Sequence, residues 1–557
     1  MLKWKKLSFI DRVLTIALVL ITIYRVLIAM KIPLFLQADA YYDDYLYVLY
    51  SKSLMRFQWL GNFSELTLAK GCSFSFFLIF NYIFGIPYSF GLIITFIISI
   101  VIFLKTIKRI INNKFFLFFT YVYLLFSPVM LHSENIQKVY RGGLLLSFAL
   151  LVISGVIGIY TRINDSKKKS ILKYVILTSL SLSYFWFLKE DSIWIMPFVL
   201  GGLFFTIIDI IKDKNNNKKR IVYTIIPLLF LFFSITIYKS INYIKYGEYT
   251  ITDRNGTYFK EVVSDLLQIE DKKSNKDHWI TKSMMEKAYE VSPSLSKIKK
   301  EMNLEYESEW IDEDGEIVGD IIFWVIKDAA HKSGLYDNGG KEVNNYYKKV
   351  HNELTKGFES GRLKKNDEIY VSKVVKGITK DEMTDYIELM KKSRKVLLTH
   401  EEYDLGLYEP TGQTNNIALF NELTMSQIVL PNSSEIIYSP SVKVISLCKK
   451  IVVFYKKTGL VLYYTFIVSF IIQCLDMLYS LFKKKENENK KLFLIELGLI
   501  VTCFAQFFGT TFFCRFLDDR KIYDYLSIIF PLIQILEMMG IYYIISKIKK
   551  IAKKKYL

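Results

Sequence analysis

The sequence contains few cysteines and lacks the usual signatures of soluble enzymes. Only five cysteines occur in 557 residues, and residues 242–447 contain none, so no disulfide framework is expected in that segment. There is no glycine-rich phosphate loop and no Gly-x-Ser-x-Gly elbow, which argues against nucleotide-driven chemistry. Four of the histidines are scattered without the close spacing of a zinc site. We therefore predict no cofactor and no obligatory metal.

Apolar residues dominate the chain instead. Hydrophobic residues make up 52% of it, and the mean hydropathy is +0.24. Several runs approach the ~20 apolar residues that a helix needs to cross a bilayer. The first run, Phe9–Met30, is too long for a cleavable signal peptide and has no small-residue cleavage site, so it should remain as an anchor. These features predict an all-α polytopic membrane protein.

The formal net charge of +19 comes largely from local clusters of lysine and arginine. Each cluster lies at the end of an apolar run, as the positive-inside rule predicts for cytoplasmic loops. Lysines at these positions also attract anionic lipid headgroups, so the charge favours a membrane partner over nucleic acid. The clusters are residues 3–6, 105–109, 167–169, 212–220, 483–491 and 548–555.

Apolar runs and basic loops together predict about 10–11 transmembrane helices with both termini in the cytoplasm. Residues 31–70 would then lie outside the cytoplasm. Residues 72–104 are broken at 85-GIP-87 and must cross the membrane an odd number of times, because 105–109 should be inside. Further spans are expected near 115–131, 142–160, 171–188, 191–211, 221–241, 452–481, 492–513 and 524–546.

The chain divides into three predicted parts, without an internal repeat. Residues 1–241 form a transmembrane module, in which 31–70 make the first external loop. Residues 242–450 form a mainly helical extracytoplasmic domain. Residues 451–557 supply the last membrane helices and a basic cytoplasmic tail.

Three local patterns predict helices in the extracytoplasmic domain. Apolar residues recur at helical spacing in 319–334 and in 343–358. Ser292, followed by a proline, is typical of a helix start.

Three aspartates, Asp39, Asp43 and Asp44, follow the first span in 37-QADAYYDDYLYVLYSK-52. Apolar residues from Tyr42 onward recur at helical spacing, which predicts a helix along the outer membrane interface. Asp39 and Asp43 would share one face of this helix, with Asp44 one step round. A carboxylate at that place could take a proton from an acceptor hydroxyl as a general base. Alternatively, the aspartates only keep the interfacial helix in contact with water.

Cations follow at two further places on the predicted outer face. Lys70 opens an apolar segment, where it could hold a phosphate group or anchor the helix end by snorkelling. Residues 132–143 could bind phosphate too, because arginine contacts its oxygens bidentately, or could be an ordinary polar loop. Their charged and polar side chains include His132, Glu134, Lys138 and Arg141.

Two charged groups near later spans complete the set. Lys189, Glu190 and Asp191 interrupt an apolar run at a tight external turn. Such charges are expected to pair or to face an aqueous cavity, although a simple hairpin turn is the alternative. Arg515 opens 515-RFLDDR-520, whose charges either neutralise one another or hold an anionic substrate.

These features resemble the GT-C class of integral-membrane glycosyltransferases, which includes protein O-mannosyltransferases and the aminoarabinose transferases of lipid A. The class carries an acidic pair on its first external loop, where this chain has 43-DD-44, and some members have a lysine like Lys70 in 69-AKG-71. The resemblance implies a GT-C-like fold with Asp43 as the base. It also implies that Lys70 and, by looser matches, Arg141 and Lys189 hold the phosphate of a polyprenyl-phosphate sugar.

The chain is also similar to an uncharacterised bacterial membrane family in residues 65–78, 186–197 and 346–363. One departure from the GT-C pattern is the long external segment, which precedes the last three predicted spans. Many GT-C members carry theirs at the C-terminus. The role of residues 242–450 in binding an acceptor therefore stays open.

The resemblance implies a multi-pass cell-membrane enzyme that transfers a sugar, with inversion, from polyprenyl phosphate to a hydroxyl of a cell-wall polymer, glycolipid or protein. One alternative is a transporter or flippase for a lipid-linked glycan. Transporters commonly show repeat symmetry or charges near mid-span, and neither is evident in the sequence. The other alternative is a non-catalytic envelope scaffold. The candidate catalytic residues are Asp43 and Asp44, and the candidate substrate-binding residues are Asp39, Lys70, His132, Glu134, Arg141, Lys189, Glu190, Asp191 and Arg515.

Overall fold

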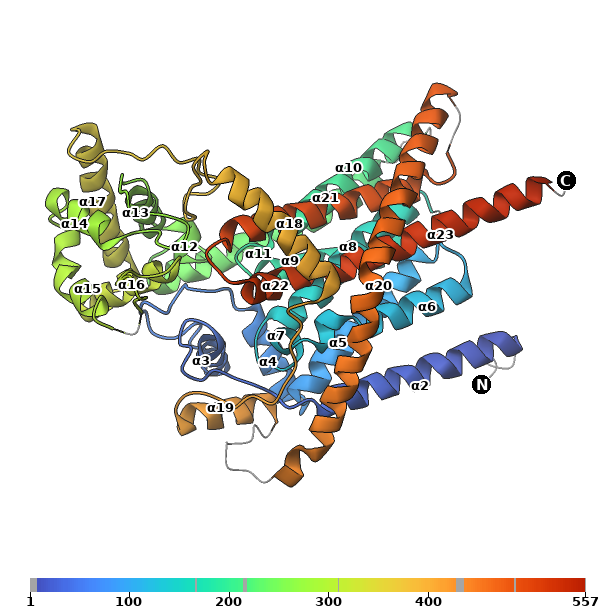
Figure 1. Cartoon of the computed structure of the whole chain (residues 1–557), viewed down its shortest axis with the longest axis horizontal. Coiled ribbons are helices and arrows are strands. Elements are labelled where there is room, and N and C mark those ends of the chain that lie inside the picture. The colour runs from blue at the N-terminus through green and yellow to red at the C-terminus, as the bar shows by residue number, and fades with distance from the viewer. Residues whose placement is uncertain are drawn as a thin grey trace.

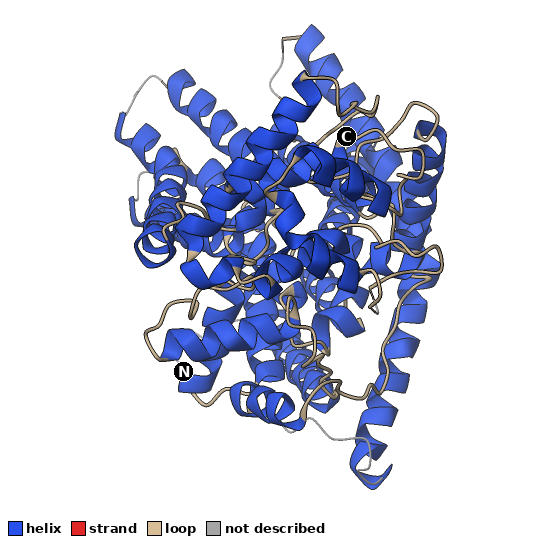
Figure 2. Ribbon diagram, turned by 90° about the vertical axis from the view of Figure 1, so that its left-hand side faces the viewer, coloured by secondary structure: helices blue, strands red, loops and turns tan. Residues whose placement is uncertain are grey.

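The computed structural model describes residues 8–165, 168–213, 218–308, 310–426, 435–484 and 487–555. These residues form helices joined by loops. A few isolated β-bridges occur in the loops, and no strand is present among the described residues (Figure 2). A bundle of long apolar helices carries a soluble helical domain at one end, and both chain termini lie at the other end (Figure 1). We call these the domain end and the basic end of the bundle.

Nine helices of the described residues are long and apolar enough to cross a membrane. The predicted all-α polytopic membrane protein is therefore confirmed. The spans are formed by α2 (Phe9–Lys31), α5 (Tyr88–Ile107), α6 (Lys114–Leu125), α8 (Gly142–Arg162), α10 (Met196–Lys212), α11 (Lys218–Tyr246), α20 (Glu435–Phe482), α21 (Lys490–Phe513) and α23 (Phe530–Lys555).

A tenth helix, α9 (Lys168–Trp186), lies in the bundle although lysines and serines lower its hydropathy. It packs between α8 and α11. Gly155 of α8 allows this close approach, because a Cβ there would lie 2.2 Å from Oγ1 of Thr178. Ten helices agree with the lower predicted number, and an even number agrees with both termini at one end (Figure 1).

The uncertain stretch 72–104 crosses the bundle once. The short helix α4 (Ser73–Ile83) ends near Gly85, and α5 then makes the single span. The hydroxyl of Tyr88, the first residue of α5, donates to the carbonyl of Lys138 at the domain end. The predicted odd number of crossings is therefore confirmed.

Several charged side chains lie inside the spans, contrary to the expectation from the sequence. Arg25 of α2, Glu496 of α21 and Glu537 of α23 are fully buried. Each lies within an apolar stretch of its helix, so the mean hydropathy of the span does not reveal it. The statement that no charge lies near mid-span is therefore wrong.

The soluble domain has its own apolar core, built from side chains between Phe259 and Tyr386. The predicted helices at 319–334 and 343–358 are confirmed as α16 (Ile321–Lys332) and α17 (Gly340–Glu359). Ser292 instead follows α14, and a 3₁₀ turn begins at Leu295. The other helices of the domain are α12 (Asp253–Gly256), α13 (Tyr258–Leu267), α14 (Lys282–Val291) and α15 (Lys299–Glu305).

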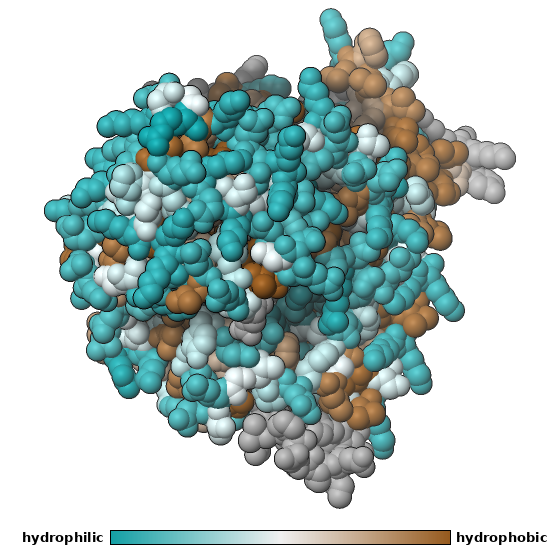
Figure 3. Space-filling model, turned by 60° about the vertical axis from the view of Figure 1, so that its left-hand side comes forward, coloured by the Kyte–Doolittle hydropathy of each residue, from teal (hydrophilic) through white to brown (hydrophobic). Residues whose placement is uncertain are grey.

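Short helices cover the domain end of the bundle beneath the soluble domain. They include α3 (Asp44–Met55), α7 (Ser133–Ile136), α18 (Met383–Thr399), α19 (Thr414–Thr424) and α22 (Asp519–Leu526). Hydrophilic side chains cover the face turned to the viewer in Figure 3, whereas hydrophobic side chains gather towards its right-hand side. The exposed apolar residues of α2 and α11 agree with contact to lipid.

Candidate functional site

The first loop after α2 brings two adjacent aspartates into different surroundings. The predicted helix is present as α3, which begins at Asp44 and buries Leu46, Tyr47 and Tyr50. The side chain of Asp43 is 53% exposed, whereas that of Asp44 is fully buried. Asp39 lies before the helix and accepts a hydrogen bond from Thr411. Asp43 is therefore the member of the acidic pair that a substrate can reach.

Asp43 is held by a lysine and a tyrosine that come from two other segments. Nζ of Lys70 donates to Oδ1 of Asp43 at 2.5 Å and to the hydroxyl of Tyr140 at 2.9 Å. The Tyr140 hydroxyl donates in turn to the same Asp43 oxygen at 3.0 Å. The candidate base and the candidate phosphate ligand thus bind one another.

Asp44 forms the buried side of the same group. Its Oδ1 lies 3.5 Å from Nζ of Lys138, which also lies 3.6 Å from Oε2 of Glu134. Its Oδ2 accepts the backbone N–H of Gln37 at 3.3 Å. One lysine therefore serves two carboxyl groups, and the Asp44 carboxyl is only partly neutralised.

The turn at 187–191 brings Glu190 to Arg141 and adds one further cation, Lys189. Arg141 donates to both oxygens of Glu190 at 2.9 and 2.8 Å and lies over the ring of Tyr140. Nζ of Lys189 lies 2.8 Å from Asp191. The approach of this turn depends on Gly71, because a Cβ at that position would lie 2.2 Å from the carbonyl oxygen of Phe187.

Eight of these residues form one group, which we call the Asp43 cluster. It holds four carboxyl groups and three cationic side chains, and every cation has a carboxylate within 4 Å. Ion pairs of this kind offset the cost of burying charge only when their geometry is good. The members are Asp43, Asp44, Lys70, Glu134, Lys138, Tyr140, Arg141 and Glu190.

The cluster separates the pKa values of the two aspartates. Partial removal from water would by itself raise the pKa of the half-exposed Asp43 carboxyl, but the nearby charges of Lys70, Lys138 and Arg141 hold this pKa well below its usual range. Burial raises the pKa of Asp44 to about 7, and the charge of Asp43 adds to this effect against that of Lys138. Two adjacent carboxyl groups with different proton affinities are typical of acid–base sites.

Five predicted site residues lie outside the cluster: Lys189 and Asp191, which pair with each other as described above, and the three residues that follow here. Asp39 contacts Thr411, as described above. His132 is fully buried; its Nδ1 accepts the backbone N–H of Asp404, and its Nε2 then donates to Oδ1 of Asp524 at 2.6 Å. Arg515 is also buried and donates to the carbonyls of residues 376, 377 and 512. In this structure these contacts join segments of the fold.

Two tyrosines near the predicted charges could not be singled out from the sequence. Tyr140 contacts both Asp43 and Lys70. The ring of Tyr525, from α22, lies 5.0 Å from Nζ of Lys189 and is 40% exposed. With 39 tyrosines in the chain, residue type alone carried no signal. The position of Tyr140 between Lys138 and Arg141 was the one available clue.

An apolar cavity of about 160 Å³ lies in the membrane part between α8, α10 and α21. Its wall includes Pro197, Gly201, Gly202 and Gly498, whose small side chains leave the space open. Pro197 lies six residues after Asp191, so the upper wall of the cavity follows directly from the 187–191 turn. A short length of hydrocarbon chain could lie in this cavity.

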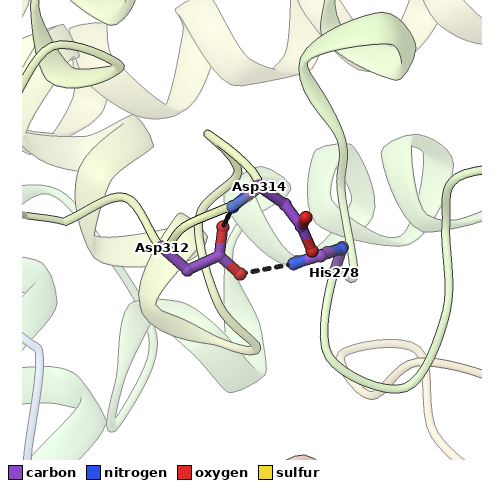
Figure 4. Close-up of side chains that lie close together, drawn as sticks. All are labelled: His278, Asp312 and Asp314. Carbon is purple, nitrogen blue, oxygen red and sulfur yellow. Dashed lines mark hydrogen bonds and ion pairs between the residues drawn. The ribbon is translucent and has the colours of Figure 1, made fainter.

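One group in the described residues has the composition of a metal site, and it lies in the soluble domain. Ligand atoms of His278, Asp312 and Asp314 lie within 4.8 Å of one another (Figure 4). Nε2 of His278 is 2.6 Å from Oδ2 of Asp312, whose other oxygen accepts the N–H of Asp314 at 3.0 Å. One imidazole and two carboxylates suit a transition metal, but here His278 already pairs with Asp312.

No family model, curated protein or solved structure matches this chain.

Proposed function

We propose that the protein is a GT-C-type glycosyltransferase that moves a sugar from a polyprenyl-phosphate carrier to an acceptor hydroxyl on the outer side of a cell membrane. The observation that carries this proposal is the half-exposed Asp43 carboxylate beside Lys70 at the domain end of an apolar bundle. A base and a cation for phosphate then lie at the depth of lipid headgroups. The acceptor is a cell-wall polymer, a glycolipid or a protein.

The reaction would form a bond between the acceptor oxygen and the anomeric carbon. The bond from that carbon to the phosphate oxygen breaks, polyprenyl phosphate leaves, and the acceptor proton passes to Asp43. The ion pair with Lys70 makes Asp43 a weak base. A donor phosphate that draws Lys70 towards itself would remove this effect, so donor binding would activate the base.

Arg141 of the cluster and the neighbouring Lys189 also suit the donor. Arg141 and Lys189 are cations whose present partners, Glu190 and Asp191, could be exchanged for phosphate oxygens. The apolar cavity below the 187–191 turn could take part of the prenyl chain. No metal is needed in this scheme, because Lys70 and Arg141 would neutralise the leaving phosphate.

The test is turnover of labelled polyprenyl-phosphate sugars by purified protein. Asp43→Asn should lower transfer by about 100- to 10,000-fold, the usual contribution of a general base, while donor binding is kept. Asp44→Asn should lower the transfer rate less, because Asp44 is buried and a substrate cannot reach it. Asp381→Asn, an exposed change in the soluble domain, is the matched control. Full transfer by Asp43→Asn would exclude Asp43 as the base.

A second candidate function is a transporter or flippase for a lipid-linked glycan. It is favoured by the buried Arg25, Glu496 and Glu537 inside the spans, because intramembrane charges commonly mark transport pathways. The two functions differ in their product. A flippase would move the labelled donor across proteoliposomes intact, whereas a transferase would release polyprenyl phosphate.

A further inference from the structure

Two glutamate–glutamine pairs lie in the membrane part, away from the Asp43 cluster. Oε2 of Glu496 on α21 accepts a hydrogen bond of 2.6 Å from Nε2 of Gln473 on α20. Glu537 and Gln534 lie one turn apart on α23, and both bind Tyr123. The hydroxyl of Tyr123 donates to Glu537 Oε2 at 2.6 Å, and its carbonyl accepts from Gln534 at 3.0 Å. All four glutamate and glutamine side chains are buried.

Both pairs contain more acceptors than donors. In the part of the chain that the structure describes, Oε1 of Glu496, Gln473, Glu537 and Gln534 has no hydrogen-bond partner. Within the same residues, neither glutamate forms an ion pair with lysine or arginine. Burying an ionised carboxylate without a cation is very costly, and so is burying an unsatisfied acceptor. Something that supplies positive charge or a donor is therefore required at each pair.

A single proton satisfies both free oxygens of the Glu496 pair. If Oε1 of Glu496 carries the proton, its O–H can donate to Oε1 of Gln473. The acid and the amide then form a ring with two hydrogen bonds, one of which is the observed bond from Gln473. Turning the Gln473 amide round would instead place its oxygen against the carboxyl oxygen. At Glu537, a proton on Oε1 would likewise remove the buried charge and put a donor in place of an unsatisfied acceptor.

The Glu496 pair lies next to a group that reaches the basic end. Asp476 is one turn beyond Gln473 on α20, and its side chain is 38% exposed. It accepts hydrogen bonds from Tyr543 and from Lys547, both on α23. Of the titratable side chains on α20 and α23, the thiol of Cys474 and the hydroxyl of Tyr543 lie close enough to interact with Glu496. The Glu537 pair instead faces Tyr123 and Tyr455.

We propose that Glu496 with Gln473, and Glu537 with Gln534, are proton-binding sites in the membrane part of the protein. The Glu496 site takes its proton from water at the basic end by way of Asp476 and Tyr543. No other bond forms or breaks in this step. The proposal goes beyond the transfer reaction and does not depend on it, because it rests on residues that are not members of the Asp43 cluster.

Infrared spectroscopy of the purified protein tests the protonation state. At neutral pH, the wild-type spectrum should contain carbonyl bands of protonated carboxylic acids that shift in heavy water. Glu496→Gln and Glu537→Gln should each remove one such band while leaving the unfolding midpoint close to that of the wild type. Glu488→Gln, at an exposed ion-paired glutamate of the basic end, is the matched control and should remove none. Absence of the two bands from the wild type would overturn the proposal.

Further measurements keep the proposal testable if a glutamine variant does not fold. Gln473→Ala should shift the Glu496 band rather than remove it, because the acid loses its amide partner. Asp476→Asn should slow the exchange of the Glu496 band in heavy water several-fold, and unchanged exchange would overturn the route. A rise of the unfolding midpoint with sodium or potassium at constant pH, lost in Glu496→Gln, would identify a cation site and overturn proton binding.

Discussion

The Asp43 cluster and the two glutamate–glutamine pairs deal with buried carboxyl groups in opposite ways. In the cluster, each carboxylate has a lysine or arginine within 4 Å. Within the described part of the bundle, Glu496 and Glu537 contact only neutral donors. Asp43 is half-exposed, so water lowers the cost of keeping charged groups in the cluster, and lysine and arginine can pair with its carboxylates. Inside the membrane part, neutralisation by a proton costs less than burial of a second charge.

Among the changes that test this comparison, the largest effect is expected for Lys70, the cation that binds Asp43. Lys70→Ala should weaken the binding of polyprenyl-phosphate sugar by about 10- to 100-fold, because a charged hydrogen bond to phosphate is lost. Equilibrium binding of labelled donor measures this. Lys70→Arg should recover part of the affinity, and Lys272→Ala, at an exposed lysine of the soluble domain, should have no effect. Unchanged donor affinity in Lys70→Ala would mean that Lys70 only neutralises Asp43.

Arg515 is a third case: a buried cation whose partners are backbone carbonyl groups and not carboxylates. Arg515→Met leaves the carbonyls of residues 376, 377 and 512 without their donor. We expect a loss of about 2–4 kcal/mol in stability, since charged hydrogen bonds are removed and acceptors stay buried. Thermal unfolding in detergent and limited proteolysis of the soluble domain measure the effect.

Arg520→Met is the matched control for that change. Arg520 lies five residues further on, is half-exposed and pairs with Asp404, so its loss should cost less than about 1 kcal/mol. Equal losses of stability in the two variants would show that the buried hydrogen bonds of Arg515 stabilise the fold no more than an exposed ion pair does.

The smallest effect concerns Asp44. Its carboxyl group has a lysine nearby, as in the rest of the cluster, but its pKa is raised by burial so that it also holds a proton near neutral pH. Because its pKa is raised from 3.8 to about 7 in the folded protein, the folded state binds this proton more tightly than the unfolded chain. The stabilising contribution is complete below about pH 4 and is lost as the pH rises through about 7. Asp44→Asn should therefore raise the unfolding midpoint by a few degrees at about pH 8 and leave it unchanged near pH 4.

Thermal unfolding of both proteins across this pH range checks the sign. A midpoint of Asp44→Asn that falls below the wild type at about pH 8 would contradict it. The ion pair with Lys138 would then outweigh the cost of burying the carboxylate.

Much of the architecture could be predicted from local sequence patterns. The helices α16 and α17 follow their apolar periodicity, and α3 follows that of residues after Tyr42. The odd number of crossings in 72–104 followed from the lysines at 105–109, because loop charge reports topology. The proximity of Lys70, Arg141 and Glu190 to Asp43 was expected only in outline, since a shared membrane face does not specify contacts.

Other features depended on residues far apart in the chain. Arg515 looked like a substrate ligand, but the 376–377 backbone occupies its guanidinium. Glu496 and Glu537 were missed because one charged residue changes the hydropathy of a long helix very little. Their meaning also depends on Gln473 and Tyr123, which lie 23 and 414 residues away in sequence.

The sequence by itself determined the membrane class, the helical content and the position of the acidic pair after the first span. These follow from composition and from short-range spacing, which act within one or two helical turns. Only the tertiary structure decided which aspartate is exposed, which cation binds it and which carboxyl groups have none. Those outcomes depend on burial and on distances of a few ångströms between segments, and no local pattern specifies either.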